Sequence, residues 1–242
     1  MNNRPQSGFT LIELLVVLGI IALLASLLLP SIARGKESGR RTRCGQNLRQ
    51  LQIGISLYAS DNDSSFPSRS TKSGWSSQLK NFITTSTLLV CPTDFTTVAN
   101  ASQLPPNPDN WPRSYVLNGF NDIYRARLSD EEWIRFPKTI SPIALKESTV
   151  ERPSETILFG EKTAESSRLY VDVLAEPNTY FRELEERRHN RSPRAGSNKG
   201  ASNYALMDGS LRAIAFGKAT CPVNMWCLTD LWRTNAALCR PR

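Results

Sequence analysis

Side chains that enzymes commonly use for catalysis are scarce in this sequence. It has a single histidine, His189, which lies in the strongly charged segment 182–191. It has no Gly-x-Ser-x-Gly motif, no phosphate-binding loop and no His-x-x-x-His pair. We therefore expect no enzymatic activity and no catalytic residue, and we expect His189 to lie at the protein surface.

Paired metal-ligand motifs are also lacking. The sequence contains five cysteines, none of them in the Cys-x-x-Cys spacing that is typical of a zinc site. The oxygen-rich segment 61–65 lacks the glycine and the distal glutamate of an EF-hand calcium loop. The sequence therefore predicts no metal ion and no cofactor.

Charged residues are almost absent from segment 9–29, which reads FTLIELLVVLGIIALLASLLL. At about 1.5 Å per residue, a helix of this length spans roughly 30 Å, the thickness of a bilayer core. The run is longer than the apolar core of a secretory signal peptide, and residues 30–33 form a poor cleavage site. We therefore predict a transmembrane helix over residues 9–30.

Glu13 is the one charged residue in this apolar segment. A carboxylate well inside a spanning helix costs about 2.5–3.5 kcal/mol on insertion scales, so such residues usually have a partner. The alternative is that the Glu13 carboxylate lies close enough to the interface to reach the lipid headgroups.

Residues 7–16, SGFTLIELLV, resemble the prepilin motif of type IV pilins and type II secretion pseudopilins, with Gly8, Phe9 and Glu13 in register. The resemblance implies a leader, residues 1–8, that a prepilin peptidase removes before it methylates the Phe9 amine. It implies that Glu13 takes part in assembly with other pilin-like subunits on an inner-membrane platform. It also implies a single-pass protein of the bacterial inner membrane, with the leader cytoplasmic and the globular domain extracytoplasmic.

The chemistry of these residues is consistent with that role. Cleavage creates an amine on Phe9 with an ordinary pKa of about 7.7–8.0, which is positive at neutral pH and can pair with Glu13 of a neighbouring helix. A side chain at Gly8 would obstruct the peptidase. Pro30 also fits the family, whose anchor helix often carries a proline near this depth, because proline removes one helix hydrogen bond and allows a kink.

Basic residues follow the apolar segment and account for much of the net charge of +8: Arg34, Lys36, Arg40, Arg41 and Arg43. The positive-inside rule alone would keep them cytoplasmic, opposite to the orientation that the motif implies. We follow the motif, because cleavage requires it. The run is then a solvated helix face or a contact with the phosphates of the lipid bilayer or with acidic neighbours. A net positive charge is also compatible with binding to nucleic acid, but no motif supports that partner.

The next segment has the periodicity of a helix with one apolar stripe: Cys44, Leu48, Leu51, Ile55 and Tyr58. We predict a stalk helix over 31–60 and a globular domain over 61–242. Short strands are expected at 114–118 and 156–160, and Asp208-Gly209 predicts a type I′ hairpin between 203–207 and 210–214. Ser129 and Glu132 predict a capping box at a helix over 128–136. The fold class is therefore α+β and pilin-like, with a long helix packed on a small antiparallel sheet.

Four further segments resemble the markers of one pilin-like subfamily. These are a stalk Cys-x-x-Asn-Leu, a Cys-Pro-x-Asp segment, a Ser-Tyr-x-x-Asn strand and a C-terminal Asp-Gly hairpin, here at 44–48, 91–94, 114–118 and 208–209. That subfamily often has a histidine ten residues before the aspartate, where this chain has Asn198.

An odd number of cysteines leaves at least one thiol without a partner in the chain. Because a disulfide is the default outside the cytoplasm, we predict the pairs Cys44–Cys91 and Cys221–Cys227, with Cys239 free. Cys221–Cys239 is the alternative for the second pair, and Cys44 and Cys91 as simple buried thiols are the alternative for the first.

Two functions from different classes fit these observations. The first is a subunit of a type II secretion or type IV pilus-like filament. The second is a membrane-tethered extracytoplasmic binding module, for DNA or polysaccharide, that uses a pilin-type anchor without assembling.

Overall fold

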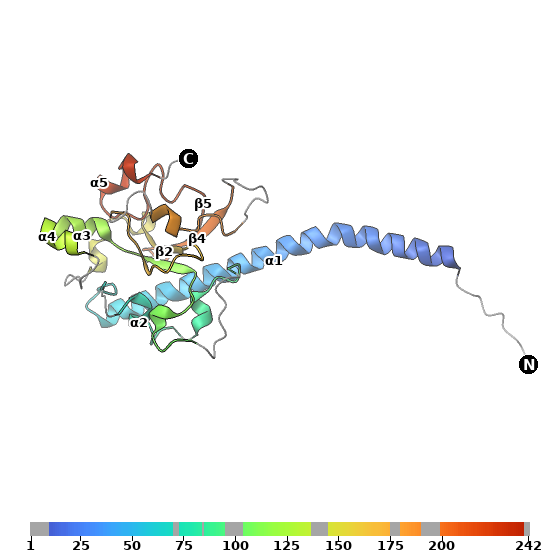
Figure 1. The fold of residues 1–242 in the computed structure, drawn as a ribbon, viewed down its shortest axis with the longest axis horizontal. Coiled ribbons are helices and arrows are strands. Elements are labelled where there is room, and N and C mark those ends of the chain that lie inside the picture. The colour runs from blue at the N-terminus through green and yellow to red at the C-terminus, as the bar shows by residue number, and fades with distance from the viewer. Residues whose placement is uncertain are drawn as a thin grey trace, which may run out of the picture. The chain divides into compact units, whose positions relative to one another are not determined.

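The computed structural model describes residues 10–69, 73–83, 85–94, 104–136, 145–174, 180–189 and 199–239. The chain forms two compact units, Met1–Gly39 and Arg40–Arg242. Helix α1, Leu11–Asp61, contributes residues to both units and continues through Pro30 (Figure 1). The kink predicted at Pro30 stays a prediction.

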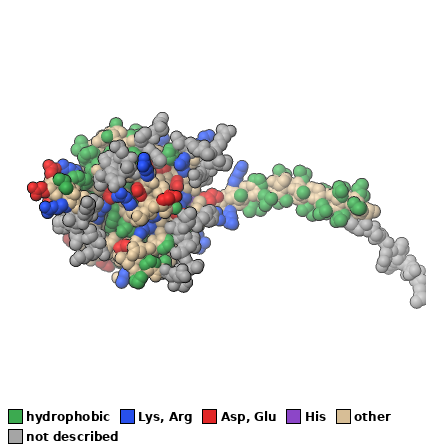
Figure 2. Space-filling model, viewed as in Figure 1, with side chains coloured by type: hydrophobic (Ala, Val, Ile, Leu, Met, Phe, Trp, Pro, Cys, Tyr) green, Lys and Arg blue, Asp and Glu red, His purple; other side chains and the backbone are tan. Residues whose placement is uncertain are grey.

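In the first unit, the apolar side chains of α1 are exposed. Figure 2 shows hydrophobic side chains covering the visible face of this segment, and Leu11 and Leu27 are 80% and 68% exposed. The helix is long and apolar enough to cross a membrane. A continuous apolar surface of this kind marks contact with lipid or with other apolar helices.

In the second unit, residues 40–61 of α1 form one wall of the core. Cys44, Leu48, Leu51 and Ile55 are fully buried, and Tyr58 is partly buried against the same cluster. The apolar stripe predicted from the sequence is therefore confirmed. Its burial is also the reason that this half of the helix belongs to the globular unit.

The second unit contains a mixed sheet in the order β3-β1-β2-β4-β5. The strands are β1 (Tyr115–Asn118), β2 (Ile157–Glu161), β3 (Tyr170–Val171), β4 (Ala201–Leu206) and β5 (Leu211–Ala215). All neighbouring pairs are antiparallel except β1 and β3, which are parallel. The α+β pilin-like class is confirmed, and the expectation of a purely antiparallel sheet fails at this two-residue edge strand.

The hairpin between β4 and β5 forms where Asp208-Gly209 predicted it, but with another turn. The Gly209 backbone N–H donates to the Leu206 carbonyl, and Gly209 has φ +87°. A type I′ turn needs positive φ at both central residues, whereas Met207 and Asp208 are not among the residues with positive φ. The turn is therefore a type I turn followed by a left-handed glycine, the arrangement of a G1 bulge.

Besides short 3-10 helices, the described part of the second unit contains four short α-helices: α2 (Trp75–Gln78), α3 (Asn121–Arg127), α4 (Asp130–Arg135) and α5 (Asp230–Arg233). The predicted capping box is confirmed, because the Glu132 backbone N–H donates to Ser129 Oγ and the Ser129 N–H donates to Glu132 Oε2. The helix that it starts ends at Arg135.

Two apolar clusters fill the second unit. The larger one contains the buried stripe of α1 together with Tyr115 and Phe159, and the other contains Val116 and Trp226. Gly160 lets the Trp226 ring approach the sheet, since a Cβ at this position would lie 2.7 Å from a ring atom of Trp226. Tyr115 and Val116 fall in different clusters because neighbouring side chains of a strand point to opposite faces.

The carboxylate of Asp109, which lies in the 3-10 helix Pro108–Asn110, caps helix α2. It accepts hydrogen bonds from the Gly74 backbone N–H (2.7 Å), the Ser76 hydroxyl (2.7 Å) and the Ser77 backbone N–H (3.0 Å). Burial opposes ionisation of Asp109, but these hydrogen bonds outweigh it and lower the pKa of the carboxyl. The ionised form therefore stabilises the fold.

We expect Asp109→Ala to lower the free energy of unfolding by about 2 kcal/mol at pH 7, because it removes charge-assisted hydrogen bonds from three donors. The contribution is present above the unfolded pKa of about 3.9 and is lost as the pH falls through the lower folded pKa, so the two proteins should converge in acid. Denaturant unfolding of the full chain in detergent measures the difference. The control Asp130→Ala, at an exposed ion pair, should change it by less than about 0.5 kcal/mol, and an equal effect of both variants would contradict the capping role.

Candidate functional site

The predicted cleavage residues Gly8 and Phe9 lie outside the described residues, as does Asn198. Glu13, the predicted assembly residue, lies in the first turn of α1. Its Oε2 accepts hydrogen bonds from the Thr10 backbone N–H (2.8 Å) and hydroxyl (2.7 Å), and the Glu13 N–H donates to Thr10 Oγ1 (3.3 Å). Thr10 and Glu13 thus form a capping box that starts α1.

This capping box is a feature that the sequence reasoning missed, although Thr-x-x-Glu before an apolar run is its signature. Both hydrogen bonds that the Glu13 carboxylate accepts from Thr10 use Oε2. Within the described residues, Oε1 accepts no hydrogen bond and is exposed with the rest of the residue. Glu13 can therefore cap its own helix and still receive a cation from another molecule.

A second polar centre is buried in the globular unit. It contains Cys44 of α1, Cys91 after a 3-10 turn, Glu161 at the end of β2, and His189, which forms a β-bridge with Ala201 of β4. Each of the four side chains is 0% exposed. One ligand-type atom from each of them lies within 4.8 Å of the other three.

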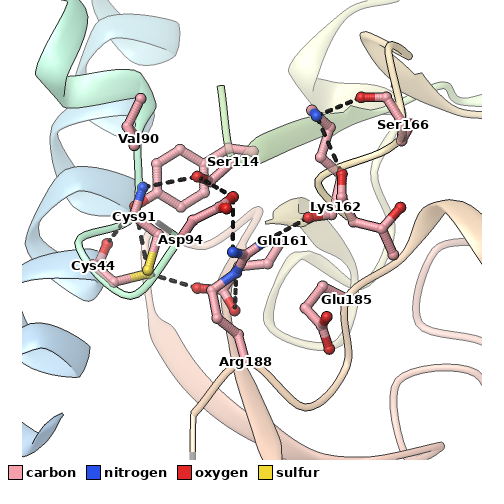
Figure 3. A network of polar contacts seen from close by, with 12 residues as sticks. Cys44, Val90, Cys91, Asp94, Ser114, Glu161, Lys162, Ser166, Glu185 and Arg188 are labelled. Carbon is pink, nitrogen blue, oxygen red and sulfur yellow. Dashed lines mark hydrogen bonds and ion pairs between the residues drawn. The ribbon is translucent and has the colours of Figure 1, made fainter. Parts of the chain in front are cut away.

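The contacts within this four-residue cluster converge on Glu161. Cys44 Sγ lies 2.6 Å from Glu161 Oε1, and His189 Nε2 lies 3.1 Å from the same oxygen. Cys91 Sγ lies 3.7 Å from His189 Nε2. Figure 3 shows Cys44, Cys91 and Glu161 facing one another beside Arg188.

Charged and polar side chains surround the cluster. Arg188 Nη1 lies 2.8 Å from Asp94 Oδ2, and Arg188 Nε lies 3.6 Å from Glu161 Oε2. Ser114 Oγ donates to Asp94 and accepts from the Cys91 N–H, at 2.8 and 2.9 Å (Figure 3). The side chains from three of the segments that the sequence singled out, 44–48, 91–94 and 114–118, therefore meet at one place.

These contacts shift the acidity of the buried groups. Burial, the Cys91 contact and the Glu161 charge all raise the pKa of the Cys44 thiol. The hydrogen bond from Cys44 lowers the pKa of the Cys91 thiol to about 6, with help from His189. Burial opposes ionisation of Glu161, but His189 and Arg188 lower its pKa. The contacts of the cluster therefore favour ionisation of the Cys91 thiol and of the Glu161 carboxyl.

The predicted cysteine pairs are corrected by the structure. Cys221 is bonded to Cys239, with a Cα–Cα distance of 5.0 Å, and Cys227 is a free thiol. The physical reason is that Cys227 turns inward and packs, fully buried, in the cluster around Trp226. Cys44 and Cys91 lie side by side as predicted, but both are free thiols.

The predicted surface position of His189 is wrong, because its side chain is fully buried. The neighbouring arginines suggested a solvated segment, but Arg188 turns inward to pair with Asp94 and Glu161. Short spacing motifs could not reveal the cluster, because its four members come from segments far apart in the sequence.

Residues 3–29 match the family model described as the prokaryotic N-terminal methylation motif. The chain is 30% identical over 112 residues to the type II secretion system core protein G of Escherichia coli (strain K12), which covers 46% of this chain and 71% of that protein. It is 36% identical over 63 residues to the core protein G of Aeromonas hydrophila, covering 26% of this chain and 44% of that protein.

A further relative is the ComG operon protein 3 homolog of Bacillus licheniformis, 33% identical over 64 residues, which are 26% of this chain and 66% of that protein. The chain thus spans less than half of the Aeromonas relative and about two thirds of the Bacillus one. No solved structure matches the chain.

Proposed function

We propose that this chain, which belongs to the family of the type II secretion system core protein G, is a membrane-anchored pilin-type subunit. In this proposal it is cut after Gly8 and assembles into a type II secretion or type IV pilus-like filament. The observation that carries the proposal is the N-terminal methylation motif at residues 3–29, together with the exposed apolar surface of α1 that lies within it. The role is structural rather than enzymatic.

The first step is processing. A prepilin peptidase hydrolyses the Gly8–Phe9 peptide bond, which leaves a carboxylate on Gly8 and an amine on Phe9, and the same enzyme methylates that amine. Residues 9–30 then remain as the lipid anchor, 31–60 as the stalk and 61–242 as the globular domain. The orientation places the leader in the cytoplasm and the globular domain outside the inner membrane.

The second step is assembly with other pilin-like subunits on the inner-membrane platform. Phe9 and Glu13 are four residues apart, which is about 6 Å along a helix. Two parallel anchor helices shifted axially by this distance bring the Phe9 amine of one chain to the Glu13 carboxylate of the next. Thr10 contacts Oε2 of Glu13, so Oε1 is available to the incoming amine. Pairing offsets the cost of two charges in the apolar phase and sets the axial register.

We expect the mature chain to begin at N-methyl-Phe9, because Gly8, Phe9 and Glu13 stand in the register of the motif. Intact-mass analysis of protein from the native membrane measures this, with cells lacking the prepilin peptidase as the control. Retention of residues 1–8 in peptidase-positive cells would contradict processing.

Electron microscopy of sheared surface and membrane filaments, combined with labelling of this chain, tests assembly. Labelled filaments support the subunit role. A correctly cut chain that stays in the membrane and never enters a filament would overturn that role and favour the tethered binding module.

A further inference from the structure

We propose that Cys44, Cys91, Glu161 and His189 form a structural zinc site inside the globular unit. The set combines two thiols, an imidazole and a carboxylate, the side chains that zinc prefers. All four are completely buried, and four protein ligands fill a tetrahedral coordination sphere. A closed site of this kind holds a fold together and leaves no open position for a substrate.

The distance from Cys91 to His189 fits a tetrahedral centre, and the two distances to Glu161 Oε1 are shorter than such a centre requires. With zinc bonds of about 2.0–2.3 Å, neighbouring ligand atoms of a tetrahedron lie about 3.4–3.8 Å apart. Cys91 Sγ and His189 Nε2 are 3.7 Å apart, and His189 Nε2 and Glu161 Oε1 are 3.1 Å apart. The Cys44–Glu161 contact of 2.6 Å has to lengthen by about 1 Å, and rotation of the Cys44 side chain can supply that change.

The charges of the cluster also favour a divalent cation. Two thiolates and the carboxylates of Glu161 and Asp94 would carry four negative charges. The Arg188 guanidinium alone offers one positive charge, and a zinc ion raises the positive charge to three. Asp94 pairs with the same guanidinium and also accepts a hydrogen bond from Ser114. Buried negative charges are costly unless they are paired or bind a metal.

One carboxylate oxygen of the cluster has an ion pair but no hydrogen bond. Glu161 Oε2 is fully buried and accepts no hydrogen bond within the described residues, since Arg188 Nε lies 3.6 Å away. A carboxylate oxygen in this position normally has a donor or a cation. Arg188 supplies that cation to Oε2, which leaves Oε1 to a zinc ion, and the site would join α1, the segment after the 3-10 turn, β2 and the segment before β4.

The competing state of the two cysteines is a disulfide. The thiols are neighbours, and an oxidising compartment favours their bond. The two states exclude each other, because zinc binds both sulfurs as thiolates. A zinc-bound pair should therefore react with neither thiol reagents nor oxidants until a chelator removes the ion.

The test is the metal content of the full chain, purified in detergent from zinc-supplied cells and measured by mass spectrometry of the metal. We expect about one zinc per chain in the wild type. We expect less than about 0.1 in Cys91→Ser and in His189→Gln, because three ligands hold zinc far more weakly than four. Cys227→Ser is the matched control, since it removes a buried free thiol outside the cluster and should keep the zinc.

A second measurement uses the wild type alone, so that it does not depend on how the variants fold. Chelation should lower the unfolding temperature by more than about 5 °C, and added zinc should restore it. Cobalt added to the chelated protein should give the near-ultraviolet absorption of thiolate-to-cobalt charge transfer. Equal zinc in the wild type and in Cys44→Ser/Cys91→Ser would overturn the proposal, as would a Cys44–Cys91 disulfide in peptide maps of the unreduced native protein. Neither result bears on filament assembly.

Discussion

Replacing Gly8 with leucine is expected to abolish removal of residues 1–8 and, with it, filament assembly. The peptidase must bring its catalytic groups to the backbone at the Gly8–Phe9 bond, and a branched side chain there blocks that approach. A barrier increase of about 3 kcal/mol corresponds to processing slowed by about 100-fold. The precursor should still be inserted in the membrane, because the apolar segment is unchanged. Immunoblotting of membrane fractions, with intact-mass analysis, measures both properties.

Gly35 offers a matched control for that substitution. It lies on α1, and a Cβ at this position would meet no atom within 4 Å. Gly35→Leu should therefore be processed at the wild-type rate. If Gly8→Leu were cut as fast as this control, the proposed cleavage position would be wrong.

Glu13→Ala is expected to insert into the membrane at least as well as the wild type and to lose incorporation into filaments. Insertion improves because a carboxylate in the apolar phase costs about 2.5–3.5 kcal/mol. Assembly fails because the Phe9 amine of the neighbouring chain is left without its counter-charge. The measurement is the ratio of the amount of this chain in sheared filaments to the amount in membranes. We expect this ratio to be more than about 10-fold lower in Glu13→Ala than in the wild type.

The capping box makes a second variant necessary. Glu13 also accepts two hydrogen bonds from Thr10, so Glu13→Ala removes a helix cap as well as a charge. Thr10→Val removes the hydroxyl but keeps the Glu13 carboxylate, and it should assemble like the wild type. Equal losses in both variants would show that the cap, not the charge pair, matters for assembly.

The local parts of the fold could be predicted from the sequence. The stripe from Cys44 to Tyr58 and the Ser129–Glu132 capping box depend on spacings of three or four residues. The hairpin position depends on the residues of one turn. The prediction of a type I′ turn was wrong because Asp-Gly suits both a type I′ turn and a G1 bulge. Only the register of the paired strands decides between them.

The buried cluster could not be predicted, because its members become neighbours only through tertiary packing. Cys44 and Glu161 are separated by 117 positions and His189 and Cys91 by 98. The charge pattern around His189 indicated a solvent-exposed segment. The sequence alone does not show that Asp94 and Glu161 form ion pairs with Arg188 in the folded chain. Cys44 and Cys91 were correctly expected to meet, from the apolar residues beside each of them.

The same long separations govern the order in which the molecule can fold. Gln52 of α1 donates to the carbonyl of Leu206, 154 positions later, and the Arg41 carbonyl accepts from Asn203, 162 positions later. High contact order of this kind slows folding, because distant parts of the chain must meet before they stabilise one another. During synthesis these contacts of α1 therefore form only after β4 has been made. This interval is when a chaperone is most needed and when aggregation competes most strongly.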